Sequence, residues 1–208
     1  MSFVKQSVCK LCRREGVKLY LKGSRCETAK CAITKRNYPP GQHSWARGKP
    51  SDYGLGLREK QKTKRYYGVL ERQFRRYFSI ANRMTGNTGN NLMTLLERRL
   101  DSVVYLLGVA LSRKAARQMV QHGHVLVNGR RCLAGARLVR SGDVIQVIPR
   151  EKSKKLAKDA LELRKGQSLP QWLQFDGDKL EARVSALPSR EDVSFEVQEQ
   201  LIVELMSK

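Results

Sequence analysis

Acidic side chains, long apolar runs and histidines are all scarce in this chain of 208 residues. Only 19 Asp and Glu stand against 41 Lys and Arg, which gives a formal net charge of +22. A charge this large repels itself and is typical of proteins that bind a polyanion, most often nucleic acid. An anionic membrane surface is the alternative, but the chain has neither a lipidation signal nor an isolated basic amphipathic helix.

The apolar runs are too short for a membrane protein. None reaches the ~18 residues that would span a bilayer, and residues 1–6 lack the apolar core of a signal peptide. We therefore expect a soluble protein of the cytoplasm.

The three histidines, His43, His122 and His124, are not spaced from a Cys, Ser or carboxylate as catalytic histidines are. The chain also contains no GxGxxG, no glycine-rich loop ending in GKS or GKT, and no HExxH. The sequence therefore predicts a binding protein and not an enzyme.

Four of the five cysteines form two close pairs near the N-terminus, Cys9 with Cys12 and Cys26 with Cys31. A CxxC turn brings two thiolates within reach of one ion, and a second pair completes the tetrahedron that zinc prefers. Four thiolates leave no open coordination position, so we expect one structural Zn²⁺ that stabilises an otherwise irregular segment, residues 1–50. Reduced thiols in a loop and an iron–sulfur cluster are the alternatives. Cys132 lies at an apolar strand position and is expected in the core.

Residues 52–83 have the apolar periodicity of two helices, the first capped by Asp52 and ending near Lys64. Their polar faces carry many cations and only two acids, Glu59 and Glu71, whereas solvated helix faces usually mix both signs. This imbalance favours phosphate contact over a solvated face. The predicted contacts are Arg58, Lys60, Lys62, Lys64, Arg65, Arg72, Arg75, Arg76 and Arg83.

A second basic region follows the loop at 86–91. Apolar residues at 92–107 have helical spacing, Ser112 can cap another helix, and Asn128-Gly129 is typical of a type I′ hairpin turn between strands at 125–127 and 130–133. A further strand is expected at 144–148, followed by a charged helix at 151–164 and short strands at 172–175 and 182–184. The predicted RNA contacts here are Arg99, Ser112, Arg113, Lys114, Arg117, Gln118, His122, His124, Asn128, Arg130 and Arg131.

These patterns predict an α+β protein in three parts. The first is a zinc-binding extension at 1–50. The second is a basic helical lobe at 51–91, completed by the acidic and apolar tail at 188–208. The third is an RNA-binding domain at 92–187 in which a helix pair packs on a small antiparallel sheet.

Residues 99–101 (RLD), 112–118 (SRKAARQ) and 123–129 (GHVLVNG) resemble the S-four RNA-binding module. Ribosomal proteins, pseudouridine synthases and tyrosyl-tRNA synthetases share this module, so an RNA-modifying or tRNA-binding enzyme is the alternative. The rest of the chain resembles bacterial-type protein four of the small ribosomal subunit. The similarity lies in residues 26–31 (CETAKC), 39–43 (PPGQH), 51–54 (SDYG), 57–62 (LREKQK), 67–71 (YGVLE), 86–89 (GNTG) and 201–205 (LIVEL).

The resemblance implies a structural protein of the small subunit and a primary binder of 16S rRNA. Members of this family bind a helix junction in the 5′ domain, nucleate subunit assembly and influence translational accuracy. They also contact ribosomal protein five and line the mRNA entry together with proteins three and five. By position, Arg47 and Lys49 are the candidates for contact with mRNA, although the loop at 44–49 departs from the commoner family pattern.

Overall fold

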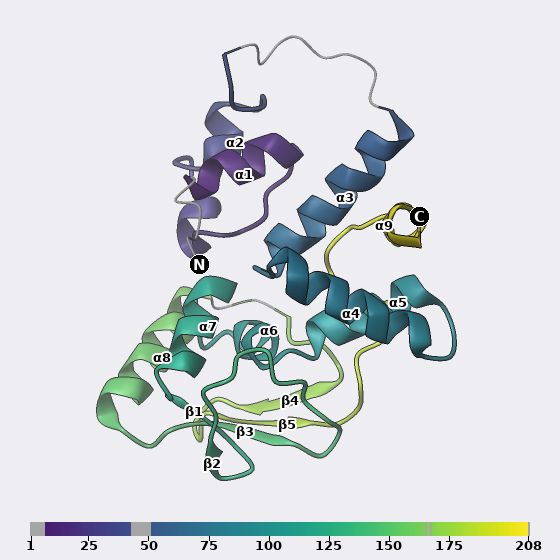
Figure 1. Ribbon diagram of the computed structural model, residues 1–208. Coiled ribbons are helices and arrows are strands. Elements are labelled where there is room, and N and C mark those ends of the chain that lie inside the picture. Colours follow the sequence, from purple (N-terminus) through teal and green to yellow (C-terminus); the bar gives the residue numbers. More distant parts are fainter. Residues whose placement is uncertain (1–6, 43–50, 165, 167, 208) are drawn as a thin grey trace. The chain divides into compact units, whose positions relative to one another are not determined.

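The computed structural model describes residues 7–42, 51–164, 166 and 168–207. It contains nine α-helices, one 3₁₀ helix and a five-stranded antiparallel sheet within those residues, which confirms the α+β prediction (Figure 1). The chain folds into two compact units, Met1–Glu71 with Val197–Lys208, and Arg72–Glu196. The first unit thus combines the N-terminal extension with a helix and the C-terminal tail, and the boundary lies before the loop at 86–91. Among the described helices, none is long and apolar enough to cross a bilayer.

The first unit is helical. It holds α1 (Val8–Glu15), η1 (Gly23–Cys26), α2 (Ala32–Lys35), α3 (Asp52–Tyr66) and α9 (Glu199–Ser207). The N-cap of α3 is Ser51, whose side chain accepts a hydrogen bond from the backbone N–H of Gly54 at 3.2 Å, so the predicted cap at Asp52 was wrong by one residue. The helix continues two residues past the predicted end.

The C-terminal helix α9 packs closely along α3. At Gly56 of α3, a Cβ atom would lie 3.0 Å from the carbonyl oxygen of Leu201 and 3.2 Å from the Cβ of Leu205. Only a residue without a side chain lets the two backbones approach this closely. The chain therefore uses glycine inside a helix, despite its low helix propensity, to bring α9 onto α3.

We expect Gly56→Val to lower the free energy of unfolding by about 1–3 kcal/mol, because the added side chain forces α3 and α9 apart. Urea unfolding of the full chain measures this loss. Tyr53→Val is the matched control, since it places the same residue at a position of α3 that is 68% exposed. Equal effects of the two substitutions would show that propensity, and not packing against α9, sets the cost.

In the second unit, the apolar run at 92–107 forms two helices where the sequence predicted one. They are α5 (Thr88–Glu97) and α6 (Leu100–Leu106), and they follow α4 (Glu71–Arg83). Between them, Arg99 is extended, with ψ of 136°. The break is stabilised by the segment at 135–139: the N–H of Leu100 donates to the carbonyl of Arg137 at 2.8 Å, and that of Val139 to the carbonyl of Arg98 at 2.8 Å. Long-range pairing therefore overrides local helix propensity.

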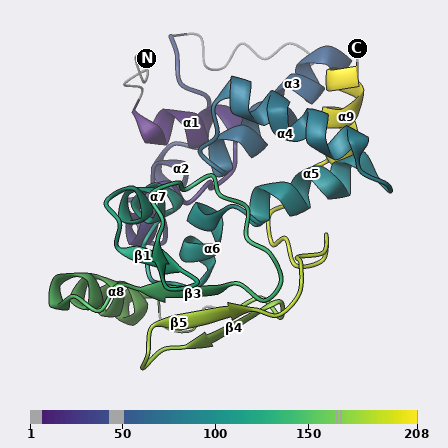
Figure 2. The ribbon, with the colours of Figure 1, turned by 60° about the horizontal axis from the view of Figure 1, so that its bottom comes forward.

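The sheet has the strand order β2-β1-β3-β5-β4 and is antiparallel throughout. Its strands are β1 (Val125–Val127), β2 (Arg130–Arg131), β3 (Val144–Val147), β4 (Leu173–Asp176) and β5 (Glu181–Val184). Two helices accompany these strands in the sequence: α7 (Arg113–Gln121) precedes β1, and α8 (Glu151–Leu163) connects β3 to β4. The hairpin β4–β5 adds to β3, although α8 separates these strands in sequence (Figure 2).

Helices α6 and α7 pack on the sheet around one apolar core. Val103 and Val104 of α6, Met119 and Val120 of α7, and Ile145 of β3 are all at most 3% exposed. Cys132 is buried in the same core, as predicted, but the strand does not continue to residues 132–133, so that part of the strand prediction was wrong. The core fixes the position of α7 relative to the hairpin.

Candidate nucleic-acid interface and cysteine pocket

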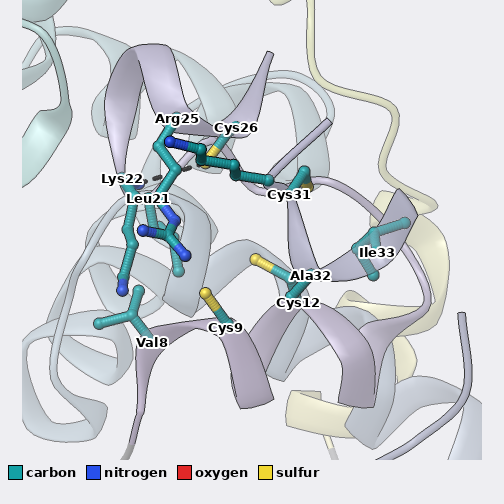
Figure 3. A pocket seen from close by; sticks show the side chains of 11 residues that line it. Val8, Cys9, Cys12, Leu21, Lys22, Arg25, Cys26, Cys31, Ala32 and Ile33 are labelled. Atoms are coloured by element: carbon teal, nitrogen blue, oxygen red, sulfur yellow. Dashed lines mark hydrogen bonds between the residues drawn. The ribbon is translucent and has the colours of Figure 1, made fainter. Parts of the chain in front are cut away.

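The four N-terminal cysteines line one pocket of the first unit. Cys9 and Cys12 belong to α1, Cys26 ends η1 and Cys31 precedes α2. Figure 3 shows the sulfur atoms of Cys9 and Cys12 directed from α1 into this pocket, with Cys26 and Cys31 on the segments opposite. The local fold thus brings together the two pairs that the sequence keeps apart.

The thiols influence one another electrostatically. Burial raises the pKa of the Cys12 thiol, a backbone hydrogen bond from Leu19 lowers it, and the other three cysteines raise it further. At Cys26 burial again raises the pKa, against a hydrogen bond from the N–H of Lys22 at 3.4 Å. Burial acts in the same direction at Cys31, but backbone hydrogen bonds from its neighbours outweigh it and lower the pKa. Thiolates gathered here repel, and a cation among them would relieve that repulsion.

The sulfur atoms are nevertheless not arranged in coordination geometry. Among the described residues, no group of three or more His, Cys, Asp or Glu is placed to hold a metal ion. The donor set itself, four thiols on one pocket, fits a closed Cys₄ zinc site. The zinc site therefore stays a prediction.

A buried carboxylate connects the cysteine-bearing helix to α3. Glu15, at the end of α1, has a side chain only 1% exposed and pairs with Arg65 and, at 3.4 Å, with Arg58. Burial raises the pKa of Glu15, although both arginines lower it. Two arginines predicted to bind RNA thus also hold α1 against α3.

The lysines of α3 are largely neutralised by the two acids nearby. Lys60 and Lys64 pair with Glu71 at 2.6 and 3.0 Å, and Lys62 pairs with Glu59 at 2.7 Å. Lys60 is only 8% exposed, so its prediction as an RNA contact is corrected: its ammonium serves the fold. The sequence showed the excess of cations but not which of them the acids would engage.

Helix α4 presents its cations differently. Arg72, Arg75, Arg76 and Arg83 are all exposed, whereas Phe74 and Tyr77 on the other side of the helix are buried. This is the separation of faces that the apolar periodicity predicted. These four side chains remain candidates for contact with phosphate.

Some polar residues at α7 are buried and stabilise the fold, and others are exposed. Ser112 caps it, as predicted, by accepting a hydrogen bond from the N–H of Ala115 at 3.2 Å. Arg113 is only 8% exposed, with its guanidinium over the ring of Tyr105 at 4.4 Å and 3.7 Å from Glu97. An ion pair and an aromatic ring therefore hold Arg113 inside, although it was predicted to contact RNA. Lys114 and Gln118 are exposed and Arg117 is half-buried.

The hairpin turn forms as the Asn-Gly sequence predicts, with φ of +52° at Asn128 and +75° at Gly129. The Asn128 side chain donates to Asp143 at 2.8 Å and accepts from the N–H of Val144 at 2.8 Å. The side-chain nitrogen and oxygen of Asn128 therefore both stabilise the turn, although Asn128 was predicted to contact RNA. Arg130 and Arg131 are exposed on β2, close in sequence to the turn.

Arg99, which was also predicted to contact RNA, is buried. It is 1% exposed, donates to Asp101 through Nε at 2.9 Å and Nη2 at 2.5 Å, and donates through Nη1 to the hydroxyl of Tyr77 at 3.1 Å. Burial lowers the pKa of this guanidinium, but the bonds to Asp101 outweigh burial and raise it. Arg99 is thus an internal cation of the fold and is shielded from a ligand.

We define the α7–hairpin surface as a set of polar residues of α7, of the turn after it and of β2: Lys114, Gln118, His122, Arg130 and Arg131, which are exposed, and Arg117 and His124, which are half-buried. The sequence analysis missed Arg150, an exposed cation at the start of α8 that acts electrostatically on His124. Its position just before a predicted helix was the available signal. Arg47, Lys49 and His43 lie outside the described residues.

Two family models match this chain. Residues 4–97 match the family described as Ribosomal protein S4/S9 N-terminal domain, and residues 98–145 match the S4 domain. A protein of Halothermothrix orenii named small ribosomal subunit protein uS4 is 53% identical over 208 residues, covering 100% of both chains. This chain belongs to the uS4 family.

Other uS4 proteins are equally similar. The uS4A protein of Alkaliphilus oremlandii is 58% identical over 203 residues and the uS4 protein of Pelotomaculum thermopropionicum is 56% identical over 202, covering 98% and 97% of both chains. Family membership confirms the resemblance stated from the sequence. It also confirms that the protein is a structural ribosomal protein and not an enzyme that carries the same RNA-binding module.

Proposed function

We propose that this protein is a constituent of the small subunit of the cytoplasmic ribosome and that it binds 16S rRNA as a primary binder. The observation that carries the proposal is the α7–hairpin surface, which lies on an S4 domain in a chain of the uS4 family. It presents Lys114, Arg130 and Arg131 on rigid elements packed against one core.

The chemistry of this surface suits the backbone of a folded RNA. Lysine and arginine side chains neutralise phosphates, and the amide of Gln118 can hydrogen-bond to a phosphate or a ribose hydroxyl. Double-stranded RNA is recognised mostly through its shape, phosphates and 2′-hydroxyls. A surface of cations and hydrogen-bond donors therefore suits the backbone of an RNA helix junction.

Family resemblance supports the finer parts of the proposal. The RNA site is a helix junction in the 5′ domain, and binding there nucleates subunit assembly. On the assembled subunit the protein contacts ribosomal proteins five and three and contributes to accuracy and to the mRNA entry, for which Arg47 and Lys49 are the candidates.

We also propose that Cys9, Cys12, Cys26 and Cys31 hold one structural Zn²⁺. The support is their common pocket, their mutual electrostatic influence and the absence of any other cysteine from it. When bound, the ion would join α1 to the segments that carry Cys26 and Cys31. The arginine pair at Glu15 would then connect this cross-linked lobe to α3.

The RNA proposal is tested by titrating the full chain with 16S 5′-domain RNA and with duplex DNA at several salt concentrations. We expect much tighter binding to the RNA and an affinity that falls steeply with salt, because phosphate contacts release counterions. The double variant Lys114→Gln with Arg130→Gln should bind more weakly, and the slope of log affinity against log salt should fall by about one for each lost phosphate contact.

Lys179→Gln is the matched control. This lysine is in the same structural unit, its side chain is 76% exposed, it pairs with Asp176 at 3.6 Å in the β4–β5 turn, and it does not belong to the residues of the α7–hairpin surface. It should leave affinity and salt slope unchanged. Equal affinity for RNA and duplex DNA would contradict the proposed function, and equal effects of the control and the double variant would contradict this surface as the binding site.

A further inference from the structure

Two histidines and an arginine meet where α7 ends. His122 and His124 flank Gly123, and their ring centroids are 6.1 Å apart. Arg131 of β2 folds back over this turn, donating through Nε to the carbonyl of Gly123 at 3.1 Å and through Nη2 to that of His122 at 2.9 Å. Gly123 has φ of +73°, and a Cβ there would overlap the guanidinium of Arg131, so only glycine permits this arrangement.

The backbone fixes His124 in place. Its N–H donates to the carbonyl of Met119 at 3.0 Å, and its own carbonyl accepts from the N–H of Ile148 at 2.9 Å. The Nδ1 atom lies 2.9 Å from the hydroxyl of Ser153, which is 1% exposed on α8. Two segments therefore hold the backbone of His124 and Ser153 holds its ring, and among the described residues Nε2 is the ring nitrogen available to a ligand.

Ser153 is a partner that suits both charge states of the imidazole. A hydroxyl can donate a hydrogen bond to the bare Nδ1 of a neutral ring and can accept one from the Nδ1–H of a protonated ring. The hydroxyl hydrogen only needs to rotate. Protonation of His124 therefore requires no rearrangement of the buried contact.

The charged groups that act on His124 come from the end of α7, from β2 and from the residue before α8, and they are all basic. Burial is the largest cause that lowers the pKa of His124, followed by His122 at the end of α7, Arg131 on β2 and Arg150 before α8. These groups disfavour the protonated imidazole in the free protein. A phosphate anion among them would offset the repulsion and favour the protonated ring.

We propose that His124 takes up a proton when a phosphate of bound RNA docks at His122, His124 and Arg131, so that this protein binds RNA more tightly as the pH falls. The inference rests on the proposed RNA-binding function. It adds that His124 binds a proton more tightly in the RNA complex than in the free protein. Two of the five N–H donors of Arg131 are engaged with carbonyl groups in the described part of the chain, which leaves others to reach the same phosphate.

The direction of the pH dependence follows from the charge of the imidazole and of the phosphate. At high pH His124 is neutral in both states and contributes no charge to the complex. As the pH falls through the range in which histidine titrates, the complex retains the proton more readily than the free protein, and affinity rises. If binding raises the pKa of the ring by about one unit, the affinity changes about tenfold across that range.

The test is a titration of the full chain with the same 5′-domain RNA between about pH 5.5 and 8 at fixed ionic strength, in the range where histidine is the group that ordinarily titrates. We expect the wild-type protein to bind about tenfold more tightly at the low end, and His124→Gln to bind with nearly constant affinity. His43→Gln is the matched control, because it removes the third histidine of the chain outside this cluster, and it should keep the full pH dependence.

Lys114→Gln is a second control, since it removes a cation of the same surface whose side chain does not ordinarily titrate in this pH range. It should weaken binding by the same factor at each pH. A wild-type affinity independent of pH, or a pH dependence that survives His124→Gln, would overturn the proton linkage while the RNA-binding function stands. Failure to bind the RNA at any pH would instead contradict the proposed function itself.

Discussion

Replacing Arg99 with methionine is expected to lower the free energy of unfolding by about 3–5 kcal/mol, because it leaves a buried carboxylate without its partner. Asp101 is 3% exposed and receives two hydrogen bonds from the guanidinium of Arg99. Methionine keeps the unbranched apolar stem of arginine and removes the guanidinium, so the unpaired carboxylate is the main source of the cost. Urea unfolding at neutral pH measures the loss.

Two controls separate this ion pair from general effects of removing a cation. Arg72→Met removes an exposed cation of the same unit and should change stability by less than about 0.5 kcal/mol. The double variant Arg99→Met with Asp101→Leu removes both charges and should recover most of the loss, since an apolar pair can replace a buried ion pair at little cost. If the double variant is no more stable than Arg99→Met, the hydrogen bond to Tyr77, and not the ion pair, carries the stabilisation.

Replacement of Cys9 by serine is expected to release zinc and to unfold the N-terminal ~50 residues. The first unit has few buried apolar side chains before Tyr66, chiefly Leu19 and the cysteines themselves. Ligation of a structural zinc ion supplies about 10–16 kcal/mol of apparent free energy in small zinc domains, far more than such a core provides. Elemental analysis should find one zinc per wild-type chain and none in the variant, and proteolysis should cleave the variant before α3.

Cys132→Ser is the matched control, because it makes the same substitution at a thiol that belongs to the core of the other unit. It should keep its zinc and an intact N-terminal segment. Stoichiometric iron in the wild-type protein, or no metal in freshly purified protein, would refute the zinc proposal. A Cys9→Ser variant that keeps both zinc and protease resistance would show that the other three cysteines suffice.

Local chemistry made several elements predictable. The Asn128-Gly129 turn forms because both residues accept positive φ, whatever lies around them. Ser112 caps α7 because a serine hydroxyl reaches a backbone N–H three residues on. The excess of basic residues, 41 against 19 acidic residues, indicated a polyanionic partner before any fold was known. Each of these signals acts within a few residues or over the whole composition.

Only the tertiary structure decided which cations are available to a ligand. Arg99, Arg113 and Lys60 cannot be told from Lys114 and Arg130 by sequence pattern, yet the first three are buried and the other two are exposed. The difference comes from the partners that the fold supplies: Asp101 and Tyr77 for Arg99, Glu97 and Tyr105 for Arg113, and Glu71 for Lys60. A buried charge needs such a partner, and only folding brings the two together.

The same reason explains the helix break at Arg99 and the return of β4–β5 to the sheet. Both depend on hydrogen bonds between segments more than 30 residues apart, which no local propensity encodes. The sequence by itself thus determined the charge of this protein, its caps and its hairpin turn. The tertiary structure decided where α5 ends, how the sheet is completed and which basic side chains face outward, because those outcomes depend on contacts that exist only after the chain has folded.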